Sequence, residues 1–574
     1  MTINGDWTDD HSSNAADKLI AVVGPGAANV QSEANKLGVA YDSRFVTNSP
    51  YTGYATYRDA IGSGVVIPAY AANQAYPGSP ATPANTFYNG FGPERGGAVF
   101  DPVARVGQWG VSAKVVAGLT SNIDLTGIFG YRKITDHHGF DISDSPILVE
   151  ETQLAVGESY KNAELRLTGK SQLVDWVLGG FYFEGSGYTH TIVYSPQTGS
   201  YRIQTISYSP LSKAVFANAT IKPLEKLDIT LGGRYSDDKK TVNYATVLDT
   251  NPTPSPLKGD VLFNVAPQAS HFDYKIGLDY HLSDTTLAYA SVSTGSRLPG
   301  YNTRPQQPDQ ISAYPGDRTV AYEAGIKADF FDHKVRLNLA GFYTDYKTRI
   351  LSATGAETNL LTGAPQAGSQ TVVPYAGGGP GATTCRPYNA ATDGAPNLAG
   401  GVGVLCIPRT YFVNTPGKVR GVEAEFQARP IDGLTFNAAV GYSHFTSPDL
   451  ELATRANDQL TGVPEVNATI GAEYSADLPR LHGTITPRID WNYTGAIAES
   501  AVQNTYNQPG YSVFNGRITY ANTDHDFSIS VGATNLFNKV YYLNFFVYQD
   551  IGYPSVNAQP AAPREWYLTV SKKF

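Results

Sequence analysis

Apolar and polar residues alternate with a period of two along many segments of the chain. In the segment 227–235, the apolar residues Leu227, Ile229 and Leu231 share one face, and polar residues occupy the positions between them. The same alternation recurs over 335–343. A period of two is typical of a β-strand that has one apolar face. The pattern therefore predicts an all-β chain.

Eighteen segments fit this description, and many of them run for 10 to 14 residues. That length is long for a strand of a soluble sheet but suits a strand that crosses a bilayer at a tilt. The predicted strands lie near 1–9, 109–120, 122–133, 159–169, 173–185, 211–221, 227–240, 270–281, 285–293, 319–330, 334–347, 411–429, 434–446, 465–475, 483–494, 510–521, 526–535 and 564–574.

The connections between these strands alternate between short and long. Short ones include 283–284 and 331–333, whereas the longest are 10–108 and 348–410. A transmembrane antiparallel β-barrel has short periplasmic turns on one side and long extracellular loops on the other, and a soluble sandwich has no reason to sort its loops in this way. The even strand count places both chain ends on the short-turn side. The Gly- and Pro-rich stretch 354–408 is expected to lack regular structure.

The composition narrows the function classes. Of the 574 residues, 16% are charged, 38 are tyrosine and 57 are glycine, and the net charge is −9. The acidic balance and the scattered Lys and Arg residues argue against nucleic-acid binding. No run of about 18 apolar residues is present, which excludes a transmembrane helix. No nucleophile elbow, P-loop, dinucleotide fingerprint or zincin motif occurs, so we expect neither an enzyme nor a bound cofactor.

Five sequence blocks resemble the C-terminal barrel of TonB-dependent receptors. The last of them, 534–539, is similar to the motif of that family's final loop, and it precedes a final strand that ends in an aromatic residue. The other four blocks occur in the expected order. They are Leu231-Gly232-Gly233-Arg234-Tyr235, Gly295-Ser296-Arg297-Leu298-Pro299-Gly300, Tyr322-Glu323-Ala324-Gly325-Ile326-Lys327 and Val419-Arg420-Gly421-Val422-Glu423-Ala424-Glu425. Ser296 and Leu298 depart from the residues that are commoner in the family.

This resemblance implies an outer-membrane receptor that takes up a scarce, bulky solute such as a ferric siderophore; cobalamin, haem and an oligosaccharide are other solutes of that kind. Family members have 22 strands around a plugged lumen, so we interpret 1–574 as a partial barrel domain with no plug, signal peptide or TonB-contacting segment. Coupling to the TonB complex is expected only for a form with a plug. The expected partners also include outer-membrane lipid and the barrel-assembly machinery, which would read Phe574. A passive porin-like channel, a non-functional truncated barrel and a surface adhesin or enzyme are the alternatives.

Two groups of residues are candidate functional sites. Arg297, Tyr301, Asn302 and Arg304 begin the loop after the ninth predicted strand, where cations and an aromatic ring at a barrel mouth suit an anionic ligand. The alternative for this group is packing at the base of the loop. His137-His138, beside Asp136 and Asp141, opens another loop, but adjacent side chains on an extended chain point in opposite directions. A solvated polar loop is therefore favoured there over a metal site.

Cys385 and Cys406 fall in one long loop. In an oxidising compartment they are expected to form a disulfide; two free cysteines are the alternative. Their spacing and the lack of a nearby histidine argue against a metal site.

Overall fold

The computed structural model describes most of the chain, and every statement below concerns its described residues. These residues are 1–12, 17–22, 41–51, 104–142, 144, 150–195, 200–249, 261–301, 313–314, 316–355, 383–387, 404–446, 462–498, 506–522, 524–547 and 555–573.

Eighteen strands form the wall of the molecule, and each pairs antiparallel with the next. In order they are β1 (Thr2–Asp10), β3 (Ala104–Thr120), β4 (Ile123–Asp141), β5 (Glu151–Lys170), β6 (Val174–Ser195), β7 (Ser200–Leu224), β8 (Leu227–Asp249), β10 (Gln268–Ser283), β11 (Thr286–Ser296), β14 (Arg318–Phe330), β15 (Val335–Gly355), β17 (Val404–Ala428), β18 (Leu434–Thr446), β19 (Val466–Tyr474), β21 (Gly483–Thr494), β22 (Tyr511–Asn522), β23 (Phe527–Thr534) and β26 (Glu565–Lys572). All eighteen predicted strands are confirmed.

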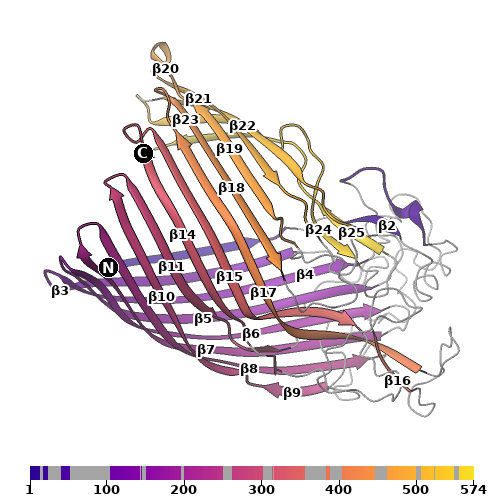
Figure 1. Ribbon diagram of the computed structural model, residues 1–574. Helices are drawn as coiled ribbons and strands as arrows, with labels where there is room; N and C mark the ends of the chain where they lie inside the picture. The colour runs from indigo at the N-terminus through magenta and orange to yellow at the C-terminus, as the bar shows by residue number, and fades with distance from the viewer. Residues whose placement is uncertain are drawn as a thin grey trace.

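The sheet curls so that the strands of its two halves face each other across an interior (Figure 1). Both chain ends lie at the end of the strands that carries the short turns, as predicted (Figure 1). The turn after β14 shows how tight these connections are: Phe331, Asp332 and His333 all adopt left-handed backbone angles, with φ of 53°, 54° and 62°. No helix among the described residues is long and apolar enough to cross a membrane.

Smaller strands lie mostly within the long connections. Three of them extend the main sheet locally: β9 (Val261–Val265), β16 (Thr383–Pro387) and β20 (Ala476–Leu478). Far from the short turns, β2 (Lys18–Val22), β25 (Ser555–Pro560) and β24 (Tyr542–Val547) form a three-stranded sheet, and β12 (Gly300–Tyr301) pairs with β13 (Ala313–Tyr314). Two short 3-10 helices complete the described structure, η1 (Ser43–Phe45) and η4 (Pro479–Leu481).

Several strands are longer than predicted, and the expectation of an irregular 354–408 was wrong in part. The strands β5 to β8 contain 20 to 25 residues. Within 354–408 the structure places the end of β15, all of β16 and the beginning of β17. Backbone hydrogen bonds continue the hairpins where apolar residues no longer alternate with polar ones, so the sequence pattern fades before the strands end.

The strands expose their apolar residues and shelter their polar ones. On β10, Phe272 is 56% exposed and Ile276 is 44% exposed. The residues on either side of Phe272, His271 and Asp273, have side chains only 14% and 20% exposed. This arrangement is the reverse of a soluble sheet, and it matches a barrel whose outer face meets lipid.

Polar residues of the opposite, inner face pair with their neighbours along the wall. The guanidinium of Arg234 lies 5.2 Å from the ring centroid of Phe181. The hydroxyl of Tyr289 donates a hydrogen bond of 2.7 Å to Glu323. At the short-turn end, Arg336 donates two hydrogen bonds to Asp329, at 2.7 and 2.9 Å. Charged residues of the inner face are therefore held by neighbours on the same or the adjacent strands of the wall.

Candidate binding site on the inner wall

Five residues from four strands form a cluster, here called the wall cluster, on the inner face of the sheet. They are Glu158 and Tyr160 of β5, Tyr208 of β7, Lys240 of β8 and Tyr301 of β12. The strand register brings them together, because Glu158 lies opposite Gly187 of β6, Gly187 opposite Tyr208, and Lys240 opposite Pro210. These positions alternate with outward apolar residues such as Leu165 and Val215, which are 58% and 61% exposed.

The carboxylate of Glu158 is the polar centre of the wall cluster. The hydroxyls of Tyr160 and Tyr208 each donate a hydrogen bond to it, one to each oxygen. Tyr160 is two residues from Glu158 on β5, whereas Tyr208 of β7 reaches Glu158 across β6, and glycine at two inward positions of β6 leaves room for both rings. A Cβ at Gly185 would lie 2.8 Å from the Tyr160 ring, and one at Gly187 would lie 2.6 Å from the Tyr208 ring.

Lys240 lies between two aromatic rings. Its ammonium nitrogen is 4.7 Å from the ring centroid of Tyr208 and 5.4 Å from that of Tyr301. Tyr301 is 7% exposed and packs with Ile206 and Val242. Cation–π contacts of this kind hold the ammonium over the ring faces. The wall cluster thus combines a cation, aromatic rings and a hydrogen-bonded carboxylate, groups that suit an anionic ligand with aromatic parts.

The structure separates the residues that the sequence grouped at this loop. Tyr301 belongs to the wall cluster. Arg297 instead forms an ion pair of 2.6 Å with Asp317, and its backbone N–H donates to the Asp317 carbonyl at 2.9 Å. Arg297 therefore joins the ends of β11 and β14 at the base of the loop between them, and its part in ligand binding stays a prediction. Asn302 and Arg304 lie outside the described residues, as does Phe574.

Sequence reasoning missed Glu158, Tyr160, Tyr208 and Lys240 as site residues. Glu158 and Tyr208 lie just beyond the predicted strands 159–169 and 211–221, where the alternation fades. One signal was present: a tyrosine on each of β5 and β7 facing a glycine on β6. Its meaning depends on the register between neighbouring strands, which the sequence pattern does not define.

The histidine pair belongs to a strand, not a loop. Asp136, His137, His138 and Asp141 all lie within β4, which corrects the prediction that His137-His138 opens a loop. His138 pairs with Asp136, with Nε2 2.7 Å from Oδ1. No group of three or more potential metal ligands occurs among the residues that the structure describes.

Cys385 of β16 lies directly opposite Cys406 of β17 in the backbone register. Directly opposite residues on antiparallel strands have Cα atoms roughly 4.5 to 5.5 Å apart, within the range that a disulfide requires. The disulfide stays a prediction. Peptide mapping without reductant is expected to recover the two cysteines in one cross-linked fragment, which separates after reduction. Alkylation of both thiols without reductant would contradict it.

The outward apolar band, the sorted turns and the inner polar wall define an outer-membrane type of β-barrel. The family described as "TonB dependent receptor-like, beta-barrel" matches residues 29–536, and the chain belongs to this family. Its members are outer-membrane receptors and transporters, not enzymes.

Individual relatives agree on the fold. The ferric yersiniabactin uptake receptor of Yersinia pestis superposes with a TM-score of 0.61 at 18% identity, covering 82% of this chain and 61% of that one. The ferric-catecholate import receptor of E. coli K12 has a TM-score of 0.58 at 14% identity, covering 88% and 69%. The pesticin receptor of Yersinia pestis is 25% identical over 202 residues, 35% of this chain and 28% of its own. The chain thus spans less than two thirds of the length of the yersiniabactin receptor and matches a smaller part of the pesticin receptor.

Proposed function

We propose that the protein is an outer-membrane receptor that takes up a ferric siderophore, and that the wall cluster contacts the bound chelate. Coupling to the TonB complex belongs to this proposal for a form of the protein that carries a plug. Recognition of Phe574 by the barrel-assembly machinery is likewise part of it. The proposed activity is transport of the solute, in which no covalent bond is made or broken.

The position of Lys240 between two tyrosine rings is the observation that carries the proposal. Many ferric siderophores are anionic and bear aromatic iron-binding groups, which an ammonium and aromatic rings can bind by charge and stacking. The family and the siderophore receptors among its solved structures support the same solute class. The glycines of β6 contribute indirectly, because they leave room for the rings.

Binding of ferric chelates to the purified protein tests this proposal. Titration calorimetry in detergent is expected to detect binding of ferric yersiniabactin or of a ferric catecholate. Ferric citrate, which has no ring, should bind with lower affinity. Replacing Lys240 with glutamine should weaken the aromatic chelate about tenfold, the effect of one charged contact. Lys275→Gln is the matched control, because Lys275 is also an inward lysine but lies on β10, outside the wall cluster. Equal affinities of wild type and Lys240→Gln would contradict the proposed contact, and no binding of any chelate would contradict the solute class.

The alternative of a passive channel makes a different prediction. A porin-like barrel would conduct small ions steadily in a planar bilayer, whereas a receptor that binds its solute need not. A large, constant conductance without any chelate binding would favour the channel.

A further inference from the structure

The arrangement that holds Lys240 in the wall cluster occurs a second time on β6, β7 and β8, closer to the short turns. In the wall cluster, Gly187 of β6 leaves room for the Tyr208 ring of β7, and that ring meets the ammonium of Lys240. Eight residues away on β6 and on β7, Gly179 leaves room for the Phe216 ring in the same way. A Cβ at Gly179 would lie 2.4 Å from that ring.

Arg234 of β8 supplies the cation of this second arrangement. Its guanidinium carbon lies 5.2 Å from the ring centroid of Phe181 and 5.8 Å from that of Phe216. Phe181 belongs to β6, and Phe216 lies directly opposite Arg234 in the register of β7 and β8. The cation is thus set between two aromatic rings, as Lys240 is. We call Arg234, Phe181, Phe216 and Gly179 the lower cluster.

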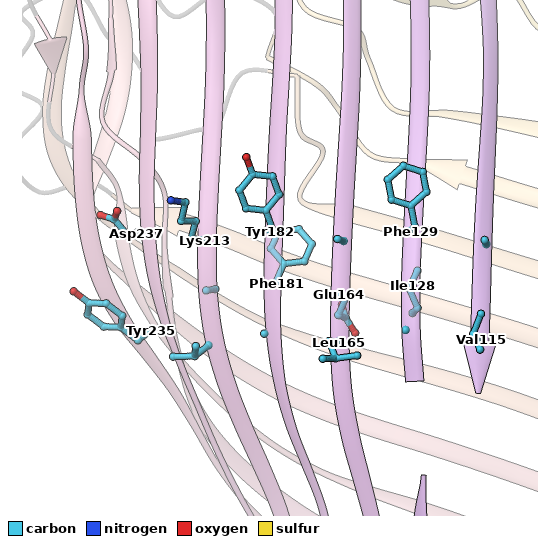
Figure 2. A pocket seen from close by; sticks show the side chains of 16 residues that line it. Val115, Ile128, Phe129, Glu164, Leu165, Phe181, Tyr182, Lys213, Tyr235 and Asp237 are labelled. Atoms are coloured by element: carbon cyan, nitrogen blue, oxygen red, sulfur yellow. The ribbon is translucent and has the colours of Figure 1, made fainter. Parts of the chain in front are cut away.

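The lower cluster belongs to the inner face of the wall. The residues that follow Arg234 and precede Phe216, Tyr235 and Val215, are 50% and 61% exposed on the outer face. Successive residues of a strand point to opposite faces. Figure 2 views the outer side of these strands, with Tyr235 projecting outward and Phe181 on the far side of β6. A solute inside the barrel can therefore reach the lower cluster.

The Arg234 guanidinium keeps hydrogen-bond donors for a ligand. Its Nε donates a hydrogen bond of 3.0 Å to Ser236, and its two terminal nitrogens have no partner among the residues that the structure describes. Asp273 lies opposite Arg234 on β10, but the two form no ion pair within 4.0 Å. Asp273 instead accepts a hydrogen bond of 3.0 Å from Ser296 and lies 3.6 Å from His271. The guanidinium leans away from it, over the rings of β7 and β6.

A second carboxylate beside the lower cluster also has a partner. Glu164, opposite Phe181 in the register of β5 and β6, forms an ion pair of 3.3 Å with Arg166. The terminal nitrogens of Arg234 are therefore the donors that the lower cluster can offer to an oxygen ligand. A guanidinium presents parallel N–H donors that match the paired oxygens of a carboxylate or a catecholate. The two phenylalanine rings favour a ligand that is aromatic as well.

We propose that the lower cluster is a second binding site for the anionic aromatic chelate, which the solute meets after the wall cluster on its way toward the short turns. This inference rests on the proposed function, because it assigns the same class of solute to a second place on the wall. Six residues of β8 separate Arg234 from Lys240, or roughly 20 Å along the strand. One small chelate cannot contact both cations at that separation, so each site holds its own molecule.

Equilibrium dialysis of the purified protein in detergent tests this proposal. The probe is the ferric complex of 2,3-dihydroxybenzoate, made with radioactive iron so that bound chelates can be counted. The wild type is expected to bind two chelates per protein. Arg234→Gln should weaken one of them about tenfold, the effect of losing one charge-assisted contact, and leave the other unchanged. Lys240→Gln should weaken the other one, and the double variant should weaken both.

Two matched variants separate the lower cluster from general effects on the wall. Arg132 is an inward arginine of β4 that already binds Asp6 at 2.7 Å, so Arg132→Gln should bind like the wild type. Gly179→Ala displaces the Phe216 ring and should weaken the lower site. Gly180→Ala changes the next residue, which faces outward and where a Cβ would meet only a backbone oxygen at 3.9 Å, and it should bind like the wild type.

The outcomes distinguish this inference from the proposed function. Two chelates bound with wild-type affinity by Arg234→Gln would overturn the lower cluster as a site, as would an equal loss in Arg132→Gln. A single chelate in the wild type that is weakened by Lys240→Gln would also overturn it, while the proposed function would stand. No bound chelate in the wild type would overturn the proposed function and this inference with it.

Discussion

Replacing Leu339 with arginine is expected to destabilise the barrel by about 2–4 kcal/mol, the cost of an arginine at the lipid-facing midplane of a barrel. Leu339 is 43% exposed on the outer face of β15, a few residues from the short turn. Its side chain would have to carry a charge into hydrocarbon, with no partner at that depth. Equilibrium unfolding in lipid vesicles, followed by tryptophan fluorescence, measures the loss.

The adjacent residue provides the matched control. Asn338 faces the interior, where its amide donates a 2.9 Å hydrogen bond to Glu425. An arginine at 338 can pair with that carboxylate, so Asn338→Arg is expected to change the unfolding free energy by about 1 kcal/mol or less. If Asn338→Arg proved as costly as Leu339→Arg, or Leu339→Arg proved neutral, the assignment of the two faces would be wrong.

Replacing Asn535 with alanine is expected to lower the free energy of unfolding by about 3–5 kcal/mol, because three hydrogen bonds are lost and alanine must adopt a left-handed backbone conformation. Asn535 is 4% exposed and follows β23 with a φ of 46°. Its amide nitrogen donates to the carbonyls of Lys539 at 2.8 Å and Ala562 at 3.2 Å. Its amide oxygen accepts from the Lys539 N–H at 2.7 Å. The side chain thereby ties the final loop to the segment that enters β26.

Asn538→Ala separates the two contributions. Asn538 is in the same loop and has a similar φ of 52°, but it is exposed, and its side chain accepts one bond, of 2.9 Å, from the Arg564 N–H. The two substitutions therefore carry the same backbone cost, and Asn538→Ala should lower the free energy of unfolding by only about 1–2 kcal/mol. Unfolding of both variants under the same conditions gives the difference. Equal losses would show that the buried hydrogen bonds of Asn535 contribute nothing beyond backbone conformation.

The wall could be predicted from the sequence because each strand carries its own signal. On β10, lipid requires an apolar residue at every second position, as at Phe272, Ile276 and Leu278, and this requirement holds without reference to any other strand. The turns are equally local, since Phe331-Asp332-His333 could be located from the two strands that it joins. The final-loop motif at Asn535 was found by resemblance, and its hydrogen bonds give that resemblance a physical reason.

The wall cluster could not be predicted in the same way. Tyr301 was a candidate, but its partner Lys240 was the last residue of a predicted strand, with no sign of which neighbour it would face. Tyr208 fell outside its predicted strand altogether. Three successive registers, from β5 through β8, decide that Glu158, Tyr208 and Lys240 meet. A shift of one residue in any of them would turn the side chains to the other face.

The central claim is that every second residue of these strands faces lipid. A spin-label scan of 271–278 on β10, in lipid vesicles and with Cys385 and Cys406 replaced by serine, tests it most directly. Labels at 272, 274, 276 and 278 should be accessible to oxygen, which dissolves in hydrocarbon, and those at 271, 273, 275 and 277 should not. Oxygen accessibility without this two-residue period, or with its maxima at the polar positions, would contradict the account.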